Sequence, residues 1–155
     1  MTNLGQTTFT GTARRIFLSL GAVAMLAGAL LPTQAHAQAA PGKNKIVFQV
    51  SDNDPGKWGL ALNNANNVQT DLGAEAVEQE IVVYGPGIGM LKADSPVAPR
   101  IASALKSGVK IVACETTLKA QKLTYADMLP NIGYVPAGVV ELMRKQQQGY
   151  AYIRP

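Results

Sequence analysis

The amino-acid sequence predicts an α/β fold: a doubly wound, mostly parallel five-stranded sheet with helices on both faces. Short apolar runs, typical of buried strands, alternate with segments whose apolar residues recur every three or four positions, typical of helices. Turn-forming residues separate many of these segments. Because parallel strands are joined by right-handed crossover connections, we expect helices on both faces of the sheet.

The first half of the predicted domain contains two strands and one helix. Residues 45–50 predict the first strand, and residues 81–84 predict the second. Between them, apolar residues with helical spacing predict a helix that ends at Gly73, a natural C-cap. These apolar residues are Trp58, Ala61, Leu62, Ala65, Val68 and Leu72. A glycine-rich turn at residues 85–89 follows the second strand.

The second half continues the alternation. Its predicted strands lie at residues 109–113, 134–135 and 150–153. A short helix around Ile101 precedes the third strand, which runs directly into Cys114 and a further helical stretch. The helix before the last strand is expected to present three apolar residues on one side: Val139, Leu142 and Met143.

Residues 1–37 are predicted to be a removable signal peptide. Two arginines at positions 14–15 precede an apolar run at residues 16–31, which is short for a membrane span of about 20 residues. Ala35-His36-Ala37 then fits a small-x-small cleavage site. We expect a tether at residues 38–44, a domain at residues 45–155, and a periplasmic or otherwise exported location.

The paired arginines resemble a twin-arginine signal, although Ala13 stands where Ser or Thr is usual. The twin-arginine and general secretory routes are both compatible with this leader. A retained membrane anchor is the alternative to cleavage.

The charge of the chain gives no sign of a nucleic-acid partner. The sequence has 14 basic and 10 acidic residues, but Arg14 and Arg15 belong to the leader, which leaves 12 basic residues against 10. These are scattered along the chain, whereas a phosphate-binding protein gathers them on one face. We therefore expect no nucleic-acid partner and, after cleavage, no stable membrane span.

Few residues of the mature chain can perform acid–base or metal chemistry. Cys114 is the only cysteine, and the only histidine, His36, lies in the leader. The domain therefore lacks an internal disulfide, a cysteine-built zinc site and the Ser–His and Cys–His pairs of hydrolases. We expect no metal and no cofactor.

Three segments are expected to meet at the carboxyl edge of the sheet, where ligands bind in such folds. They are residues 51–56, 84–89 and 114–117. Cys114 lies where a strand passes into a helix, and N–H groups at a helix start favour an anion and lower a cysteine pKa. The negative charge of Glu115 opposes this effect. A reactive thiol and a buried, inert cysteine both fit the pattern.

Five further residues near Cys114 are candidates for a pocket. Tyr84, Gly85 and Gly87 belong to a turn that either wraps an anion with its amides or is a plain loop. Thr116 and Thr117 open the helix that follows the cysteine.

Other polar residues have both a functional and a structural interpretation. Asn64 and Asn67 share one face of the first helix, where they either support the pocket or a subunit contact, or form a solvated surface. Asp52 and Asp54 stand among turn-forming residues, and we expect them to serve turns and helix caps.

Four motifs of the mature chain match one known family of small proteins. They are the Trp58 helix with Ala61-Leu62 and Asn64-x-x-Asn67, the Val83–Gly87 loop, Gly108-Val109-Lys110 leading to Cys114, and the tail from Glu141-Leu142 through Gly149–Pro155. In these motifs the sequence resembles the DsrE/DsrF-like family of small sulfur-relay proteins. The resemblance implies a doubly wound α/β subunit that forms homotrimers or hexamers.

The resemblance also implies a function for the cysteine. Relay members of the family carry sulfur as a persulfide on a cysteine after the third strand, a position that Cys114 matches. Those members are cytoplasmic, whereas this chain is predicted to reach a compartment that oxidises thiols. Our leading hypothesis is an exported carrier of sulfane sulfur, a possible sulfurtransferase component, with an unknown donor and acceptor.

Two other functions fit the sequence. The first is a non-catalytic module for small-molecule binding or oligomeric assembly, in which the cysteine is buried and inert. The second is a redox sensor that forms an intermolecular disulfide, because a lone thiol cannot resolve its own sulfenic acid within one chain.

Overall fold

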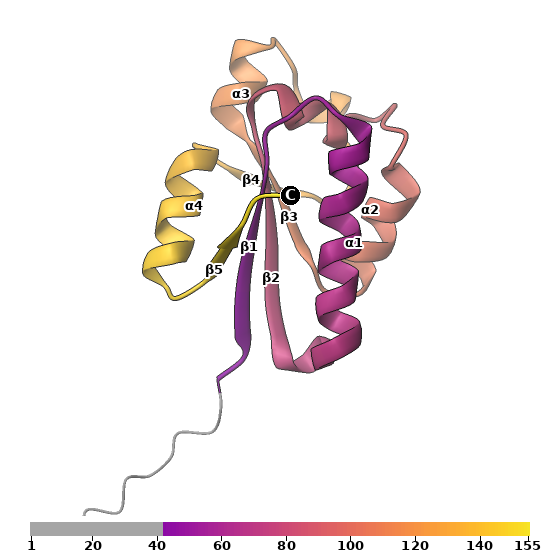
Figure 1. Ribbon diagram of the computed structural model, residues 1–155. Helices are drawn as coiled ribbons and strands as arrows, with labels where there is room; N and C mark the ends of the chain where they lie inside the picture. Colours follow the sequence, from indigo (N-terminus) through magenta and orange to yellow (C-terminus); the bar gives the residue numbers. More distant parts are fainter. Residues whose placement is uncertain (1–41) are drawn as a thin grey trace, which may run out of the picture. The chain divides into compact units, whose positions relative to one another are not determined.

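The computed structural model describes residues 42–155 and contains a five-stranded sheet in the order β4-β3-β2-β1-β5 (Figure 1). Its strands are β1 (Asn44–Val50), β2 (Val77–Val83), β3 (Lys110–Cys114), β4 (Gly133–Val135) and β5 (Ala151–Ile153). Every adjacent pair is parallel, which confirms the predicted α/β class. The predicted signal peptide at residues 1–37, and residues 38–41 of the predicted tether, lie outside the described residues.

The helices divide between the two faces of the sheet. They are α1 (Pro55–Leu72), α2 (Ala98–Lys106), α3 (Glu115–Ala120) and α4 (Gly138–Gln147), with short 3-10 helices η1 (Ala74–Ala76), η2 (Gly85–Leu91) and η3 (Tyr125–Asp127). Strands β1 to β4 lie side by side in chain order, so each connection crosses the sheet in the same direction. Right-handed crossovers therefore place α1, α2 and α3 on one face. The return to β5 places α4 on the other, as Figure 1 shows for α4 against α1 and α2.

The sheet separates a large core from a small one. Alternate strand residues such as Phe48, Ile81 and Ile111 pack under α1 and α2 in the large core. The small core beneath α4 contains five buried residues: Val47, Val82, Val112, Leu142 and Tyr150. Burial on both faces explains why the strands read as continuous apolar runs.

The ends of α1 are set by local sequence. Asp54 is the N-cap, and its carboxylate accepts a hydrogen bond of 2.8 Å from the Gly56 N–H. Gly73 ends the helix with φ of 86°, a conformation that suits glycine. The predicted cap roles of Asp54 and Gly73 are thus confirmed, whereas Leu72, predicted on the apolar face, is 49% exposed.

Two local predictions were wrong. In α4, Leu142 is buried but Val139 and Met143 are 63% and 50% exposed, because the buried face is shared with Lys145, which pairs with Glu80 under the helix. Residues 85–89 are part of the 3-10 helix η2 rather than of a simple turn.

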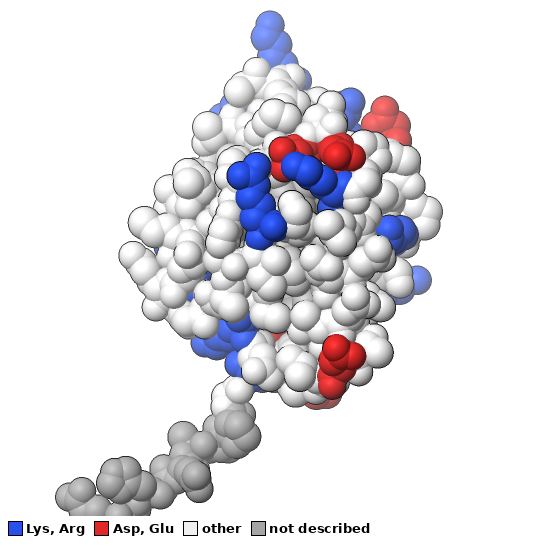
Figure 2. Space-filling view, viewed as in Figure 1, with Lys and Arg blue, Asp and Glu red and all other residues white. Residues whose placement is uncertain are grey.

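Charged side chains do not gather into a patch of one sign on the face shown in Figure 2, where basic and acidic groups lie close together. Across residues 42–155, no helix is both long enough and apolar enough to span a membrane.

Candidate functional site

Cys114 lies at the carboxyl edge of the sheet, where the chain passes from β3 into α3. It is the last residue of β3 and the N-cap residue of α3. The preceding residue, Ala113, belongs to the large core on the α1 face. Because successive side chains of a strand point to opposite faces, the Cys114 side chain points to the α4 face. The residue is only 5% exposed.

The sulfur of Cys114 meets the beginnings of two helices. Burial has the largest effect on the Cys114 pKa and raises it, but the nearby Thr117 hydroxyl and backbone N–H groups of Gly138, Thr117 and Thr116 together lower it by more. The net result is a thiol pKa below the ordinary value of 9.0. Gly138 opens α4 and the threonines open α3, so the starts of both helices contribute to the lowered thiol pKa.

The loop after β2 is fixed against the same helix start. The Thr117 hydroxyl accepts a hydrogen bond of 2.9 Å from the Gly85 N–H, which leaves its own hydrogen for the sulfur. Gln121 donates to the Gly85 carbonyl at 3.2 Å. Gly85 has φ of 56°, in the left-handed region that glycine tolerates best. The structure therefore brings Tyr84, Gly85 and Thr117 together with Cys114.

Thr116 joins the two helix starts. Its N–H and its hydroxyl both donate to the Pro136 carbonyl, at 3.2 Å and 2.7 Å. Pro136 lies two residues before Gly138. The position of α4 over the sulfur is thus linked to α3.

Gly138 is a site residue that the sequence analysis missed. A Cβ atom there would lie 3.0 Å from both Cβ and Cδ1 of Tyr84, so the absence of a side chain allows the tyrosine to pack against the start of α4. Its N–H also serves the Cys114 sulfur. A glycine between the predicted fourth strand and the apolar residues of the following helix was the available signal.

Gly87 has a structural role, and its N–H is not available to a ligand. Its N–H donates to the carbonyls of Ser51 and Tyr84, at 3.1 Å and 3.2 Å. A Cβ atom at Gly87 would lie 2.7 Å from the Val50 carbonyl oxygen. The amides of Gly85 and Gly87 are therefore used within the protein, and the anion-wrapping interpretation of this segment has no support.

Asn64 and Asn67 do not join the cysteine. They belong to α1, which packs on the opposite face of the sheet from the Cys114 side chain. Asn64 is half-buried and Asn67 is exposed. The expected pocket role has no geometric basis.

Glu115 is directed to another partner. Its carboxylate accepts a hydrogen bond from the Tyr125 hydroxyl. The main influences on the Cys114 pKa are burial and hydrogen bonds to the sulfur, and Glu115 is not among them. The carboxylate of Glu115, whose negative charge was expected to oppose the thiolate, is therefore hydrogen-bonded to Tyr125 of η3.

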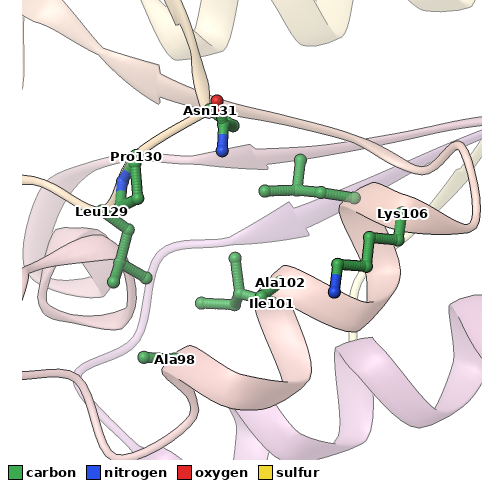
Figure 3. Close-up of a pocket in the computed structure, with 8 residues that line it drawn as sticks. Ala98, Ile101, Ala102, Lys106, Leu129, Pro130 and Asn131 are labelled. Atoms are coloured by element: carbon green, nitrogen blue, oxygen red, sulfur yellow. The ribbon is translucent and has the colours of Figure 1, made fainter.

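An apolar groove elsewhere in the molecule does not include the cysteine. Figure 3 shows it between α2 and residues 129–131, with a volume of ≈ 360 Å³. It opens beside Ile101 and Leu105, which belong to the large core, whereas Cys114 faces the α4 side.

Within residues 42–155 no group of three or more His, Cys, Asp or Glu side chains could hold a metal ion.

The lowered pKa predicts the pH dependence of thiol alkylation. The thiolate is the reactive form, so we expect the rate at Cys114 to rise with pH and to level off at a lower pH than that of an unperturbed cysteine. Iodoacetamide kinetics from pH 5 to 10, with the urea-unfolded chain as control, measure the two midpoints. A native midpoint at or above the unfolded one would contradict the assignment.

Comparisons with known proteins agree with the fold. A protein of unknown function from Methanobacterium thermoautotrophicum is 33% identical, with 73% of this chain and 100% of that chain covered and a TM-score of 0.69. A conserved protein of unknown function from Bacteroides thetaiotaomicron (15% identity, 72% and 95% covered, TM-score 0.61) and the ychN protein of E. coli (12%, 72% and 99%, 0.59) share the fold. No curated protein matches the chain.

The family model matches almost all of the described part of the chain. The match covers residues 44–155, from the first residue of β1 to the C-terminal residue, and so includes Cys114 and both helix starts around it. The chain belongs to the DsrE/DsrF-like family.

Proposed function

We propose that this chain is an exported sulfur-relay protein that carries sulfane sulfur as a persulfide on Cys114. Membership of the DsrE/DsrF-like family suggests a role of the sulfur-relay type. The observation that supports a persulfide on this residue is its position as the last residue of β3 and the N-cap residue of α3, together with the lowered pKa of its thiol.

The chemistry needs only a thiolate. The Cys114 thiolate attacks the sulfane sulfur of a donor, the donor's sulfur–sulfur bond breaks, and its electron pair leaves with the remaining fragment. The product, Cys–S–S⁻, is itself an anion that the N–H groups of Gly138 and Thr117 can stabilise. An acceptor thiolate then attacks the outer sulfur and releases the Cys114 thiolate. The transfer is complete without a metal or a histidine.

The burial of Cys114 supports a second candidate, the non-catalytic binding or assembly module with an inert cysteine. The residue is 5% exposed, which restricts access for a large reagent or a partner protein. Under the carrier proposal, the same burial favours a small donor.

Intact mass of the mature chain after incubation with thiosulfate or polysulfide tests the proposal. We expect a gain of one sulfur atom that reductant reverses and that Cys114→Ser lacks. A thiol that stays unreactive until the chain is denatured would favour the inert module. A covalent dimer that disappears on reduction would favour a redox sensor.

Two further parts of the proposal concern location and assembly. The predicted signal peptide supports a periplasmic or otherwise exported protein. Within a homo-oligomer such as a trimer or hexamer, the exposed apolar side chains of Val139 and Met143 on α4 are the candidates for a subunit contact.

A further inference from the structure

A polar cleft lies between α1 and α2, which pack on the face of the sheet opposite the Cys114 side chain (Figure 1). We call it the α1–α2 cleft, and its volume is ≈ 280 Å³. Six of the eight residues that line it have polar side chains: Asn63, Asn66, Gln69, Arg100, Ser103 and Ser107. Arg100 is the only charged residue of this lining.

The guanidinium of Arg100 is held in place by α1. Its Nη2 donates to the Gly59 carbonyl at 3.2 Å and to Asn63 Oδ1 at 2.6 Å. Because residues four apart lie on one face of a helix, Gly59 and Asn63 both face α2. A Cβ atom at Gly59 would lie 3.1 Å from Arg100 Nη1, so a side chain there would crowd the guanidinium. The cation is thus positioned in advance, which lowers the entropic cost of binding a ligand.

The charge of Arg100 has no counter-charge in the described chain. Both of its hydrogen-bond partners are neutral, and no ion pair found within residues 42–155 uses it. A guanidinium has five N–H donors, and the two bonds to α1 come from Nη2. The donors on Nη1 and Nε are therefore left for another acceptor. A carboxylate suits them best, because hydrogen bonds between charged groups are the stronger ones.

Two neutral groups of the lining are also without a protein partner. No hydrogen bond found within residues 42–155 uses the Asn66 amide or the Ser103 hydroxyl, although both line the cleft with Arg100. Gln69 and Ser107 are instead engaged, since Gln69 Nε2 donates to the Ser107 carbonyl at 2.8 Å and the Ser107 hydroxyl donates to the Ala104 carbonyl at 2.9 Å. Amide and hydroxyl groups that are open to a cleft can bind the hydroxyl groups of a ligand.

The asparagines of the cleft are unfavourable for the helix that contains them. Asn63 and Asn66 lie within α1, an 18-residue helix, where alanine would be the better helix former. Asn63 is explained by its bond to Arg100, which ties α1 to α2. Asn66 has no such structural explanation among the described contacts, and its position in the cleft is what a ligand would use.

We propose that the α1–α2 cleft binds a small hydroxy acid, with its carboxylate on Arg100 and its hydroxyl groups on Asn66 and Ser103. One unpaired cation selects a carboxylate, and amide and hydroxyl groups select a polar skeleton over an apolar chain. The volume lies at the small end of the range for ligand pockets, about 300–1,000 Å³, so the ligand is small. The site is separate from the sulfur chemistry proposed above, because Cys114 faces the other side of the sheet.

A ¹⁵N NMR titration of the mature chain with three probes tests the proposal. Gluconate has a carboxylate and hydroxyl groups, sorbitol has the hydroxyl groups without the charge, and sulfate has the charge without the hydroxyl groups. We expect gluconate to give saturable shifts at the amides around the cleft, and to bind at least tenfold more tightly than either other probe. Equal affinity for sulfate would show an adventitious ion only. That result, equal affinity for sorbitol, or a lack of saturation with gluconate would overturn the proposal.

Variants of the two kinds of binding group locate the ligand. Arg100→Lys keeps the charge but loses the planar fork, and should weaken gluconate binding about tenfold. Because Arg100 also ties α1 to α2, Asn66→Ala is the variant that leaves the fold intact. It should weaken gluconate binding severalfold, while the melting temperature stays the same or rises, since alanine is the better helix former.

Asn67→Ala is the matched control. Asn67 is the neighbouring asparagine of α1, is exposed and does not line the cleft. Its substitution should have the same effect on the melting temperature as Asn66→Ala and should leave gluconate affinity at the wild-type value. Equal affinities in the two variants would place the ligand outside the cleft and overturn the proposal. Cys114→Ser should bind gluconate as the wild type does, so failure here leaves the carrier function intact.

Discussion

We expect Lys145→Met to lower the free energy of unfolding by about 3–5 kcal/mol at neutral pH, since it leaves a buried charge without its partner. Lys145 Nζ lies 2.6 Å from Glu80 Oε2, and the two side chains are 10% and 5% exposed. Glu141 is a weaker partner at 3.7 Å. Within the described chain, Glu80 Oε1 has no hydrogen-bond partner, so the carboxylate depends on Lys145.

The loss should depend on pH in a defined direction. Burial raises the Glu80 pKa, and Lys145 opposes this rise. Without the lysine the folded-state pKa moves further above the unfolded value. The neutral carboxyl is then the form that the fold tolerates, so the stability lost at neutral pH is recovered as pH falls through the raised pKa.

Chemical denaturation at pH 7.5 and pH 5 measures both effects. Arg144→Met is the control, because Arg144 is the exposed neighbour on the same helix and should change stability by no more than about 0.5 kcal/mol. A loss in Lys145→Met below about 1 kcal/mol, or one that is equal at the two pH values, would show that the pair does not hold α4 to the sheet.

This ion pair matters for the site because little else anchors α4. The buried residues of the helix are Gly138, Leu142 and Lys145. One apolar side chain and one buried pair thus hold the helix whose first N–H meets the Cys114 sulfur.

The fold was predictable because its strands are buried on both faces. Runs such as Ile46–Phe48 and Ile81–Val83 are apolar at every position, and the helices between them need only one apolar face. The start of β2 was not predictable in this way. Glu80 is polar in sequence yet 3% exposed, because its partner Lys145 comes from the other end of the domain.

Part of the site followed from the same reasoning. The carboxyl ends of parallel strands share one edge, which is why Tyr84 and Gly85 lie with Cys114. Asn64 and Asn67 were misplaced because the periodicity of a helix does not tell which face of the sheet it covers. The hydrogen bond from Tyr152 to Gln49 was missed because it depends on β5 pairing with β1, a contact between distant parts of the chain.

Gly138→Ala should make the Cys114 thiol less acidic. The added methyl group would meet the Tyr84 ring at 3.0 Å, so either the ring or the start of α4 must move. Displacement of the helix takes the Gly138 N–H away from the sulfur and removes one of the effects that lower the thiol pKa. We expect slower iodoacetamide alkylation at pH 7, a midpoint shifted to higher pH, and a stability loss of about 1–3 kcal/mol from overpacking.

The ring of Tyr84 provides the internal control for this effect. Tyr84→Ala opens space for the methyl group, so in the double variant Gly138→Ala should cost much less stability and should shift the alkylation midpoint less than it does alone. Gly42→Ala, at a glycine with nothing within 4 Å of the added atom, should change neither quantity. If Gly138→Ala shifts the midpoint equally with and without the Tyr84 ring, steric displacement of α4 is not the cause. If it shifts the midpoint in neither background, the N-terminus of α4 does not stabilise the thiolate, and the acidity of Cys114 rests on Thr116 and Thr117 of α3.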